Sequence, residues 1–285
     1  MMDNKALESL EPELQRKLAA CRSALLRLKR VVVAFSGGVD STFLLALAVD
    51  TLGKSNVLAV TGVSAIHPKR ERESARNLAK QIDVELLEVD TDEMTNPQFL
   101  ANPPQRCYIC KRHVMTPMID LAGRRGFVAV VSGANADDMK DYRPGIAAGE
   151  ELGIINPLLE AGLTKADIRA ASLAMGLPTW DKPAAACLAS RIPYGQPVTT
   201  EKLSRIEQAE NRLRDLGFTN CRLRDHHPLA RIEVPLDQLP KVLSHRGEVL
   251  EFLKSLGFMY VTLDLEGFRS GSLNMVLTET QTSKP

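Results

Sequence analysis

The sequence predicts an α/β fold, in which a doubly wound parallel sheet is followed by a smaller C-terminal α+β domain. Three observations support this prediction. Short apolar runs alternate with helical patterns over the first half of the chain, a glycine-rich turn follows the first of these runs, and the pattern changes after about residue 175. A length of 285 residues is comfortable for two domains, which we place at 1–180 and 181–285.

The N-terminal half predicts alternating helices and strands. Leucines at roughly helical spacing predict one or two amphipathic helices over 5–30, with a break near Pro12. The apolar, β-branched run 31–35 is typical of a buried parallel strand, and the helix predicted over 41–53 ends at Gly53. The remaining predicted elements are strand 56–64, helix 69–82, strand 84–91, helix 113–126 and strand 127–134. This alternation predicts helices on both faces of a parallel sheet.

The C-terminal half has a different composition. Residues 176–198 are rich in proline, alanine and glycine, and we expect a long ordered loop there. The elements predicted beyond it are helix 200–217, strands 221–227 and 230–234, helix 236–256 and strand 259–265. These elements predict a small α+β domain, and we expect the polar last ten residues to be frayed.

The composition excludes several classes of protein. A net charge of +1 gives no sign of the basic surface expected of a nucleic-acid-binding domain. The first 30 residues are charged and lack the apolar core of a signal peptide, and no apolar run approaches the length of a membrane span. We therefore expect a soluble, cytoplasmic protein that binds neither nucleic acid nor membranes. Five cysteines are too few for a disulfide scaffold, so clustered cysteines are expected to be metal ligands or reactive thiols.

The clearest functional motif is the run SGGVDST, which follows the first predicted strand and opens a helix. The glycines allow a close backbone approach, and the helix start supplies N–H groups with partial positive charge. We expect a cradle for phosphate, in which Asp40 holds Mg²⁺. The alternative is an ordinary capped strand-to-helix turn. The residues expected to bind the nucleotide here are Ser36, Gly37, Gly38, Asp40, Ser41 and Thr42.

A second loop follows the predicted strand 127–134 and has the sequence SGANADD. In an open α/β sheet, loops at the carboxyl ends of the strands gather around one ligand crevice. Gly133 and Asp138 are therefore candidates for the same nucleotide site, and Asp137 and Asp138 are candidates to bind Mg²⁺. An ordinary turn rich in Asn and Asp is an equally good interpretation.

Three cysteines stand apart from the other two. Cys107 and Cys110 form a C-x-x-C pair, and Cys187 lies in the proline- and alanine-rich loop. The pair is compatible with a redox dithiol, a zinc site completed by Cys187 and His113, or an iron–sulfur site. Three thiolates without a fourth suit a [4Fe–4S] cluster with one iron left open to bind sulfide. The remaining cysteines, Cys21 and Cys221, are interpreted as small buried hydrophobic residues.

Basic and acidic residues cluster in the second half. Arg222 and Arg224 alternate along a predicted strand, so both point to one side and could grip a phosphate. The alternative is a solvated strand face with charge pairs. Neighbouring candidates in this half are Ser190, Arg191, Glu233, Asp264 and Arg269.

Taken together, these segments resemble the LarE family of PP-loop ATP-dependent sulfur transferases, which act in nickel-pincer nucleotide biosynthesis. The phosphate loop resembles the PP-loop signature SGGxDS of enzymes that cut ATP between its α and β phosphates. The resemblance runs from Val31 to about Gly271, and the most specific stretches are DYRPG, SRIPYG and GFRSG.

The resemblance implies an activity and its cofactors. ATP, with Mg²⁺, would adenylate the carboxylates of pyridinium-3,5-biscarboxylic acid mononucleotide, and sulfur would then displace AMP to give thiocarboxylates. The first domain would be the ATP pyrophosphatase, and the second would bind substrate and take part in sulfur transfer. Arg191, Arg222 and Arg224 would grip the substrate phosphate, with Glu233 and Asp264 near the transfer site. The resemblance also implies a homo-oligomer, and a sulfide donor that reloads the site.

The cysteines distinguish two branches of that family. Some members carry a single cysteine in the loop before SRxPYG and sacrifice its sulfur. This chain has Cys187 there and adds Cys107 and Cys110, which resembles the branch with a [4Fe–4S] cluster that carries the sulfide. Catalysis would then depend on all three cysteines, and sacrificial use of the Cys187 sulfur is the alternative.

Three other functions remain open from the sequence. A PP-loop tRNA thiolase shares the phosphate loop and often has three cysteines, but it would need a basic surface or an RNA-binding module. An ammonia-using enzyme such as NAD synthetase or GMP synthetase needs no cysteine trio. A non-catalytic nucleotide-binding or metal-binding regulator would bind ATP without releasing pyrophosphate.

Overall fold

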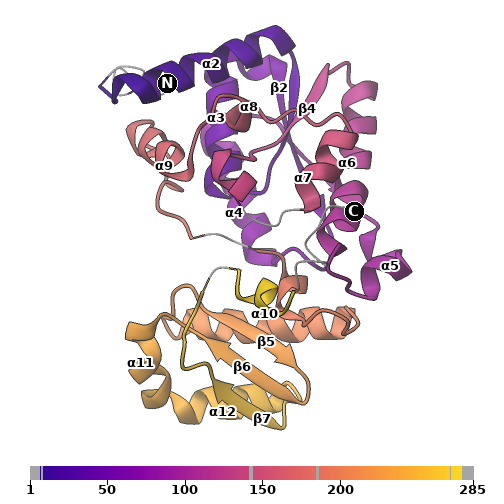
Figure 1. Ribbon diagram of the computed structural model, residues 1–285, viewed down its shortest axis with the longest axis vertical. Coiled ribbons are helices and arrows are strands. Elements are labelled where there is room, and N and C mark those ends of the chain that lie inside the picture. Colours follow the sequence, from indigo (N-terminus) through magenta and orange to yellow (C-terminus); the bar gives the residue numbers. More distant parts are fainter. Residues whose placement is uncertain (1–6, 8, 141–143, 184–185, 270, 278–285) are drawn as a thin grey trace. The chain divides into compact units, whose positions relative to one another are not determined.

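A computed structural model describes residues 7, 9–140, 144–183, 186–269 and 271–277. The chain divides into two compact units (Figure 1). Unit 1 comprises 1–64, 69–93 and 107–185, and unit 2 comprises 65–68, 94–106 and 186–285. The division predicted from the sequence was contiguous, whereas two short segments of the N-terminal half belong to unit 2. No helix in the described part of the chain is long and apolar enough to cross a membrane.

Unit 1 is built on a parallel sheet with the strand order β3-β2-β1-β4 within the described residues. Its strands are β1 (Val31–Ala34), β2 (Val57–Val63), β3 (Leu86–Asp90) and β4 (Ala129–Val131). Val31 of β1 lies opposite Val57 on one side and Ala129 on the other. Because the order reverses between β1 and β4, the loops after these two strands flank a topological switch point.

Helices cover both faces of this sheet, as the alternation predicts (Figure 1). The bounds are α2 (Pro12–Leu28), α3 (Val39–Leu52), α4 (Lys69–Ile82), α6 (Arg106–Arg124), α7 (Pro144–Glu151), α8 (Pro157–Glu160) and α9 (Lys165–Ala174). Val31 and Val33 pack into one apolar core with α2, α3, α4 and α9. Val32 points the other way and packs with α6. The doubly wound prediction is therefore confirmed.

Several predicted elements differ in detail. The helix expected over 113–126 begins at Arg106 instead, so the C-x-x-C pair lies on α6, and Pro117 is accommodated inside the helix. The helix α9 has a capping box in which the Thr164 side chain accepts from the Asp167 N–H and Asp167 bonds back to the backbone of Thr164. That box is visible in the sequence, although the predicted elements did not include this helix. The predicted stop of α3 at Gly53, where φ is +79°, is confirmed.

Unit 2 contains a three-stranded sheet of order β5-β6-β7, with β5 and β6 antiparallel and β6 and β7 parallel. Its elements are α5 (Pro97–Leu100), α10 (Thr200–Asp215), β5 (Arg222–His226), β6 (Leu229–Glu233), α11 (Leu239–Ser244), α12 (Arg246–Ser255) and β7 (Tyr260–Leu263). Helix α10 packs on β5, and α12 packs on β7. The single helix expected over 236–256 is divided at His245, which ends α11 and precedes α12.

Candidate functional site

The phosphate loop lies at the switch point of unit 1 and leads directly into α3. Gly37 has φ of +69°, and a Cβ at this position would come within 3.1 Å of Ala75. Gly38 precedes α3, and no side chain caps the helix start in the described structure. The first N–H groups of a helix lack intrahelical partners, so this start presents donors of the kind that bind phosphate.

Hydroxyl groups brace the loop from within. The Ser36 and Ser41 Oγ atoms are 3.0 Å apart, and the Gly38 N–H points to Ser36 Oγ at 3.4 Å. Thr42 is fully buried, and its Oγ1 has no hydrogen-bond partner among the described residues. A buried hydroxyl without a partner is costly in a folded protein. An anion or a metal ion at the loop would supply that partner.

Asp40 is the acidic group of this loop. Its Oδ2 accepts a hydrogen bond of 2.6 Å from the Lys165 ammonium, while its Oδ1 is buried and has no partner among the described residues. Burial raises the pKa of Asp40 above its ordinary value, although the Lys165 ammonium opposes this rise. A divalent cation at Oδ1 would favour the ionised form, so the residues present fit Mg²⁺.

Two lysines complete the surroundings of the loop, and neither was predicted from the sequence. Lys165 stands at the first position of α9, where its Nζ reaches Asp40. Lys182 Nζ donates to the Gly37 carbonyl at 3.0 Å and pairs with Glu71 at 2.7 Å. No local motif announces these contacts, because Lys165 is 125 residues from Asp40 in the chain.

The second predicted loop does meet the first. A Cβ at Gly133 would lie 2.9 Å from the Ser41 nitrogen, so only glycine allows this approach. Asp138 Oδ2 accepts from the Asn135 N–H at 3.0 Å, and Asp137 Oδ2 accepts from the Lys165 N–H at 2.8 Å. The aspartates therefore shape the turn and tie it to α9. Residues 141–143 of the DYRPG motif lie outside the described residues, and so does Ser270 of the GFRSG motif.

The five cysteines fall into two groups. Cys21 and Cys221 are buried, and burial raises the pKa of their thiols to about 12 and about 11 respectively. Their interpretation as buried apolar residues is confirmed. Cys107 is exposed, and Cys110 and Cys187 are partly buried. The accessible thiols are thus the three that were proposed as ligands.

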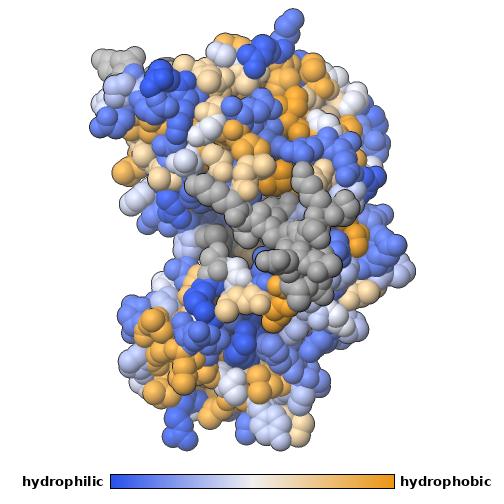
Figure 2. All heavy atoms as spheres, viewed as in Figure 1, coloured by the Kyte–Doolittle hydropathy of each residue, from blue (hydrophilic) through white to orange (hydrophobic). Residues whose placement is uncertain are grey.

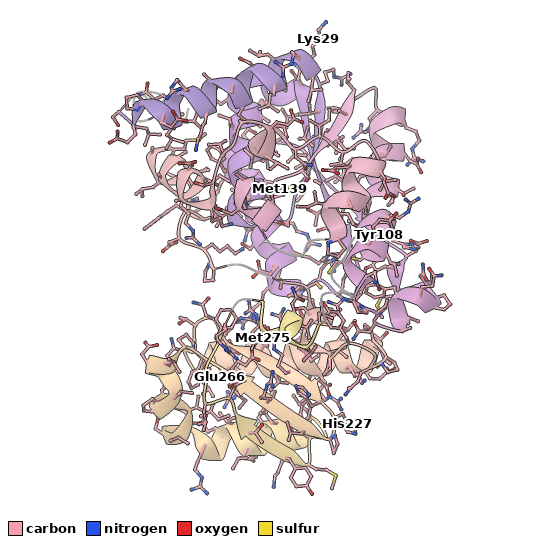
Figure 3. The ribbon with its side chains drawn as sticks, viewed as in Figure 1. Lys29, Tyr108, Met139, His227, Glu266 and Met275 are labelled. Carbon is pink, nitrogen blue, oxygen red and sulfur yellow. The ribbon has the colours of Figure 1, made fainter. Side chains whose placement is uncertain are left out.

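Cys107 and Cys110 lie near the start of α6, three residues apart, so their side chains share one helix face. Tyr108, labelled in Figure 3, stands between them in the sequence, and its hydroxyl donates to Glu151 of α7. His113 stands one turn further on, and its Nδ1 lies 2.6 Å from Asp92. Cys187 belongs to unit 2. Among the described residues, no three His, Cys, Asp or Glu side chains are grouped as a metal site.

In unit 2, Arg191 is buried and uses all of its nitrogen atoms. Its Nε and Nη2 form a fork on Glu210 at 2.8 and 3.1 Å, and its Nη1 donates to the carbonyls of Ala186 and Cys187 at 2.7 and 3.0 Å. Burial alone would raise the pKa of Glu210, but Arg191 and its neighbouring arginines outweigh that effect and lower it. This pair fixes the backbone at Cys187.

Arg222 and Arg224 are 8% and 7% exposed, so this strand face is not solvated, whereas the charge pair that the alternative expected is present between Arg224 and Glu233. Arg224 forms a fork on Glu233 at 2.8 and 2.9 Å and donates to the Ser190 carbonyl at 2.8 Å. Burial and the charge of Arg191 lower the pKa of Arg222 to about 10.

The remaining candidates of unit 2 are divided between this cluster and the surface. Arg231 Nη2 lies 3.1 Å from Glu233 Oε1, and Arg231 Nε lies 3.5 Å from Asp264 Oδ2. Asp264 therefore belongs to the same cluster. Arg269 instead pairs with Glu266 in a more exposed position. The structure therefore brings together Ser190, Arg191, Arg224, Glu233 and Asp264 but not Arg269.

The fold and the phosphate loop define the class: a PP-loop protein, with a nucleotide cradle at the switch point of a parallel sheet. Consistent with this class, a family model described as NAD synthase matches residues 13–114.

Relatives cover nearly the whole chain. Pyridinium-3,5-bisthiocarboxylic acid mononucleotide synthase of Lactiplantibacillus plantarum is 40% identical over 94% of this chain and 97% of its own length. The uncharacterized protein slr1717 of Synechocystis sp. is 44% identical over 93% of this chain and all of its own length. The uncharacterized protein MJ0830 of Methanocaldococcus jannaschii is 30% identical over 85% of this chain and 92% of its own length. The chain therefore belongs to the LarE family, which includes the Lactiplantibacillus synthase.

Proposed function

We propose that this chain is an ATP-dependent sulfur transferase acting on pyridinium-3,5-biscarboxylic acid mononucleotide. A ring carboxylate oxygen attacks the α-phosphorus of ATP, and pyrophosphate leaves. Sulfide then attacks the acyl carbon of the adenylate, and AMP leaves with the former carboxylate oxygen. The product is a thiocarboxylate, and two rounds give the dithio product. The observation that carries this proposal is the phosphate loop of unit 1, where no described side chain caps the start of α3 and where Asp40 Oδ1 and Thr42 Oγ1 have no partner among the described residues.

The loop residues have distinct tasks in the first step. The backbone N–H groups at the start of α3 bind the departing pyrophosphate and stabilise its growing charge. Asp40 would hold Mg²⁺ through Oδ1, which has no hydrogen-bond partner among the described residues. The Lys165 ammonium, which pairs with Asp40, would be released to contact the phosphates if Mg²⁺ neutralised that carboxylate instead. The Ser36–Ser41 contact braces the phosphate loop, and Gly133 lets the second loop approach it closely.

The sulfur step is assigned to the three accessible cysteines. Cys107, Cys110 and Cys187 would ligate a [4Fe–4S] cluster, for which thiolates are the usual ligands. When bound, such a cluster supplies a nucleophilic sulfide at its fourth iron. Cys21 and Cys221 cannot take part, because their thiols are buried and resist ionisation. A sulfide donor is needed to reload the cluster after each turnover.

We assign substrate binding to the charged cluster of unit 2. Arg222 and Arg224 would contact the phosphate of the mononucleotide. Glu233 holds Arg224 in place, and Asp264 pairs with Arg231, which also contacts Glu233. Arg191 supports this site by fixing the loop that contains Cys187 and Ser190. Arg269 is assigned to the outer edge of the substrate site, since it is more exposed than the others.

We also propose that the protein is a cytoplasmic homo-oligomer that binds neither nucleic acid nor membranes. Apolar side chains gather over α11 on the surface of unit 2 (Figure 2). Leu236 and Leu243 are 61% and 64% exposed there, and exposed apolar patches often mark subunit contacts.

The first experiment is to measure iron, acid-labile sulfide and the ultraviolet–visible spectrum of anaerobically prepared protein. A cubane cluster requires about four irons per chain and gives broad absorption near 400 nm. We expect Cys107→Ala, Cys110→Ala and Cys187→Ala to lose both signals, and Cys221→Ala, the matched buried control, to keep them.

Iron-free wild-type protein would refute the cluster and return Cys187 to sacrificial use. In that case the product would not exceed one sulfur per chain, and mass spectrometry would show Cys187 converted to dehydroalanine. Release of pyrophosphate from ATP with the mononucleotide tests the adenylation step separately, because it requires no sulfur.

A further inference from the structure

The chain returns to the phosphate loop of unit 1 shortly after α9. Lys182 Nζ donates to the Gly37 carbonyl at 3.0 Å and to Ser74 Oγ at 3.4 Å, and it pairs with Glu71 at 2.7 Å. Ser74 and Glu71 belong to α4, and the Lys182 side chain is only 20% exposed. A hydrogen bond from a charged donor is stronger than a neutral one, so Lys182 restrains the loop backbone directly.

The restraint acts on a single peptide unit, because the Gly37 carbonyl and the Gly38 N–H belong to the same planar group. That peptide is trans, so its carbonyl and its N–H point in opposite directions. Holding the carbonyl therefore fixes where the Gly38 N–H points. This N–H makes a long contact of 3.4 Å with Ser36 Oγ, which it can exchange for a phosphate oxygen at little cost.

Helix α9 holds the segment that contains Lys182. The Arg169 Nη1 and Nη2 atoms donate to the carbonyls of Trp180 and Lys182, each at 2.9 Å. Arg169 is four residues beyond Lys165, whose Nζ reaches Asp40, and residues at this spacing share one helix face. Helix α9 thus reaches the phosphate loop directly through Lys165 and indirectly through Arg169 and Lys182.

We propose that Lys182 and Arg169 are positioning residues that orient the Gly37–Gly38 peptide so that its N–H points at the departing pyrophosphate. This inference rests on the proposed function, because adenylation is the step that gives the loop a pyrophosphate to stabilise. Donors that are fixed in place before the reaction stabilise developing charge better than donors that must first turn. Neither side chain needs to touch ATP.

The first test is Lys182→Met, which removes the ammonium and keeps an apolar side chain. We expect kcat for pyrophosphate release to fall about tenfold, because a misdirected donor is lost chiefly in the transition state. The KM for ATP should change by less than about threefold. Arg169→Lys keeps the charge but cannot bond two carbonyls with one planar group, so its kcat should fall about threefold.

Lys17→Met is the matched control. Lys17 is 23% exposed and pairs with Asp167 at 2.7 Å, also in unit 1, so this variant loses a comparable ion pair away from the loop. It should lose as much thermal stability as Lys182→Met and keep wild-type kinetics. A wild-type kcat in Lys182→Met would refute the positioning role. A rise in the KM for ATP larger than the fall in kcat would refute it too, because Lys182 would then bind the phosphates itself.

A second measurement does not depend on turnover. The chain contains a single Gly-Gly pair, Gly37–Gly38, so glycine labelled with ¹³C at its carbonyl and with ¹⁵N gives one carbonyl–nitrogen correlation, from the peptide that Lys182 holds. Loss of the hydrogen bond should move the carbonyl resonance upfield in Lys182→Met, and by less in Arg169→Lys, but not in Lys17→Met.

The two measurements separate the positioning role from the proposed function. An unmoved carbonyl resonance in Lys182→Met would overturn the positioning role, whatever the activity. The expected shift in a protein whose wild type releases no pyrophosphate would refute the proposed function and keep the restraint on this peptide.

Discussion

The two charged regions of this protein are organised in opposite ways. In the phosphate loop of unit 1, the helix start is uncapped and the Asp40 Oδ1 and Thr42 Oγ1 atoms lack partners among the described residues. In unit 2, Arg191 and Arg224 form closed forks on the buried carboxylates of Glu210 and Glu233. The phosphate loop presents polar groups without hydrogen-bond partners among the described residues, whereas most charged groups of the unit 2 cluster are paired with one another.

This difference suggests a division of labour. Unsatisfied donors and acceptors bind an incoming ligand without first breaking protein bonds, which suits nucleotide and Mg²⁺ that must enter and leave in each turnover. Paired buried charges are expensive to rearrange, so they are suited to holding a loop or a second arginine in a fixed geometry. We therefore expect the forks of unit 2 to be structural supports and the loop of unit 1 to be a binding site.

The largest effect is expected for Glu210→Gln. Removing this charge leaves Arg191 without its carboxylate partner in a buried position, and breaking a buried pair in this way costs roughly 3–5 kcal/mol. The measurement is the free energy of unfolding in urea. Glu248→Gln is the control, because Glu248 pairs with Arg212 on the surface, where such a pair is worth at most about 1 kcal/mol. Equal losses in the two variants would show that the Glu210 fork is not a structural support.

Asp40→Asn should have the next largest effect, on activity and not on stability. The amide cannot replace the carboxylate as a Mg²⁺ ligand of full charge, so pyrophosphate release should fall roughly a hundredfold or more. Thermal unfolding should change little, since the folded state gives up a carboxylate whose ionisation burial disfavours. Asp50→Asn, on the same helix and paired with Arg22, should keep full activity. If Asp40→Asn released pyrophosphate at the wild-type rate, Asp40 would not be a Mg²⁺ ligand.

The same contrast explains what could be predicted from the sequence. The phosphate loop was predictable because its residues are contiguous and follow a strand of clear pattern. The strand order places Gly133 against Ser41, as expected for loops that share one edge of a parallel sheet. The helix boundaries were less certain, and α6 proved to start at Arg106, before the C-x-x-C pair.

Long-range partners could not be predicted from the sequence. Nothing near Arg191 or Arg224 indicates that Glu210 and Glu233 neutralise them. The partner of Arg191 is set by how α10 packs against residues 188–191, and the partner of Arg224 by how β5 pairs with β6. The contacts of Lys165 with Asp40 and of Asn102 with the SRIPYG turn are of the same kind. Each depends on tertiary packing, which leaves no periodic trace in one sequence.

Arg224→Lys is expected to have an intermediate effect that separates binding from support. Lysine keeps the charge but loses the fork on Glu233 and the bond to the Ser190 carbonyl. The KM for the mononucleotide should rise roughly tenfold, with kcat and the KM for ATP nearly unchanged. The steady-state kinetics of both substrates give this comparison directly. A fall in kcat alone would place Arg224 at the reacting carboxylate and not at the phosphate.

The smallest effect is a pH dependence that distinguishes buried from surface forks. The pKa values of Glu210 and Glu88 are both lowered, that of Glu210 by Arg191 and its neighbours against the effect of burial, and that of Glu88 chiefly by the hydrogen bond from Arg76. A lowered pKa in the folded state means that the stabilisation is complete above the ordinary carboxyl value of 4.5 and is lost as the pH falls through the folded value.

The difference in the free energy of unfolding between wild type and Glu210→Gln, called the gap below, should therefore be constant from pH 7 to about 5.5 and shrink below about 4.5. The gap for Glu88→Gln should follow the same direction with a much smaller amplitude, because solvent and salt screen the surface fork. Urea unfolding across this pH range, repeated at high salt, gives both curves. Salt should reduce the Glu88 gap and leave the Glu210 gap almost intact. A Glu210 gap that collapses with salt would mean that the fork is exposed to solvent and that the two regions differ less than the structure indicates.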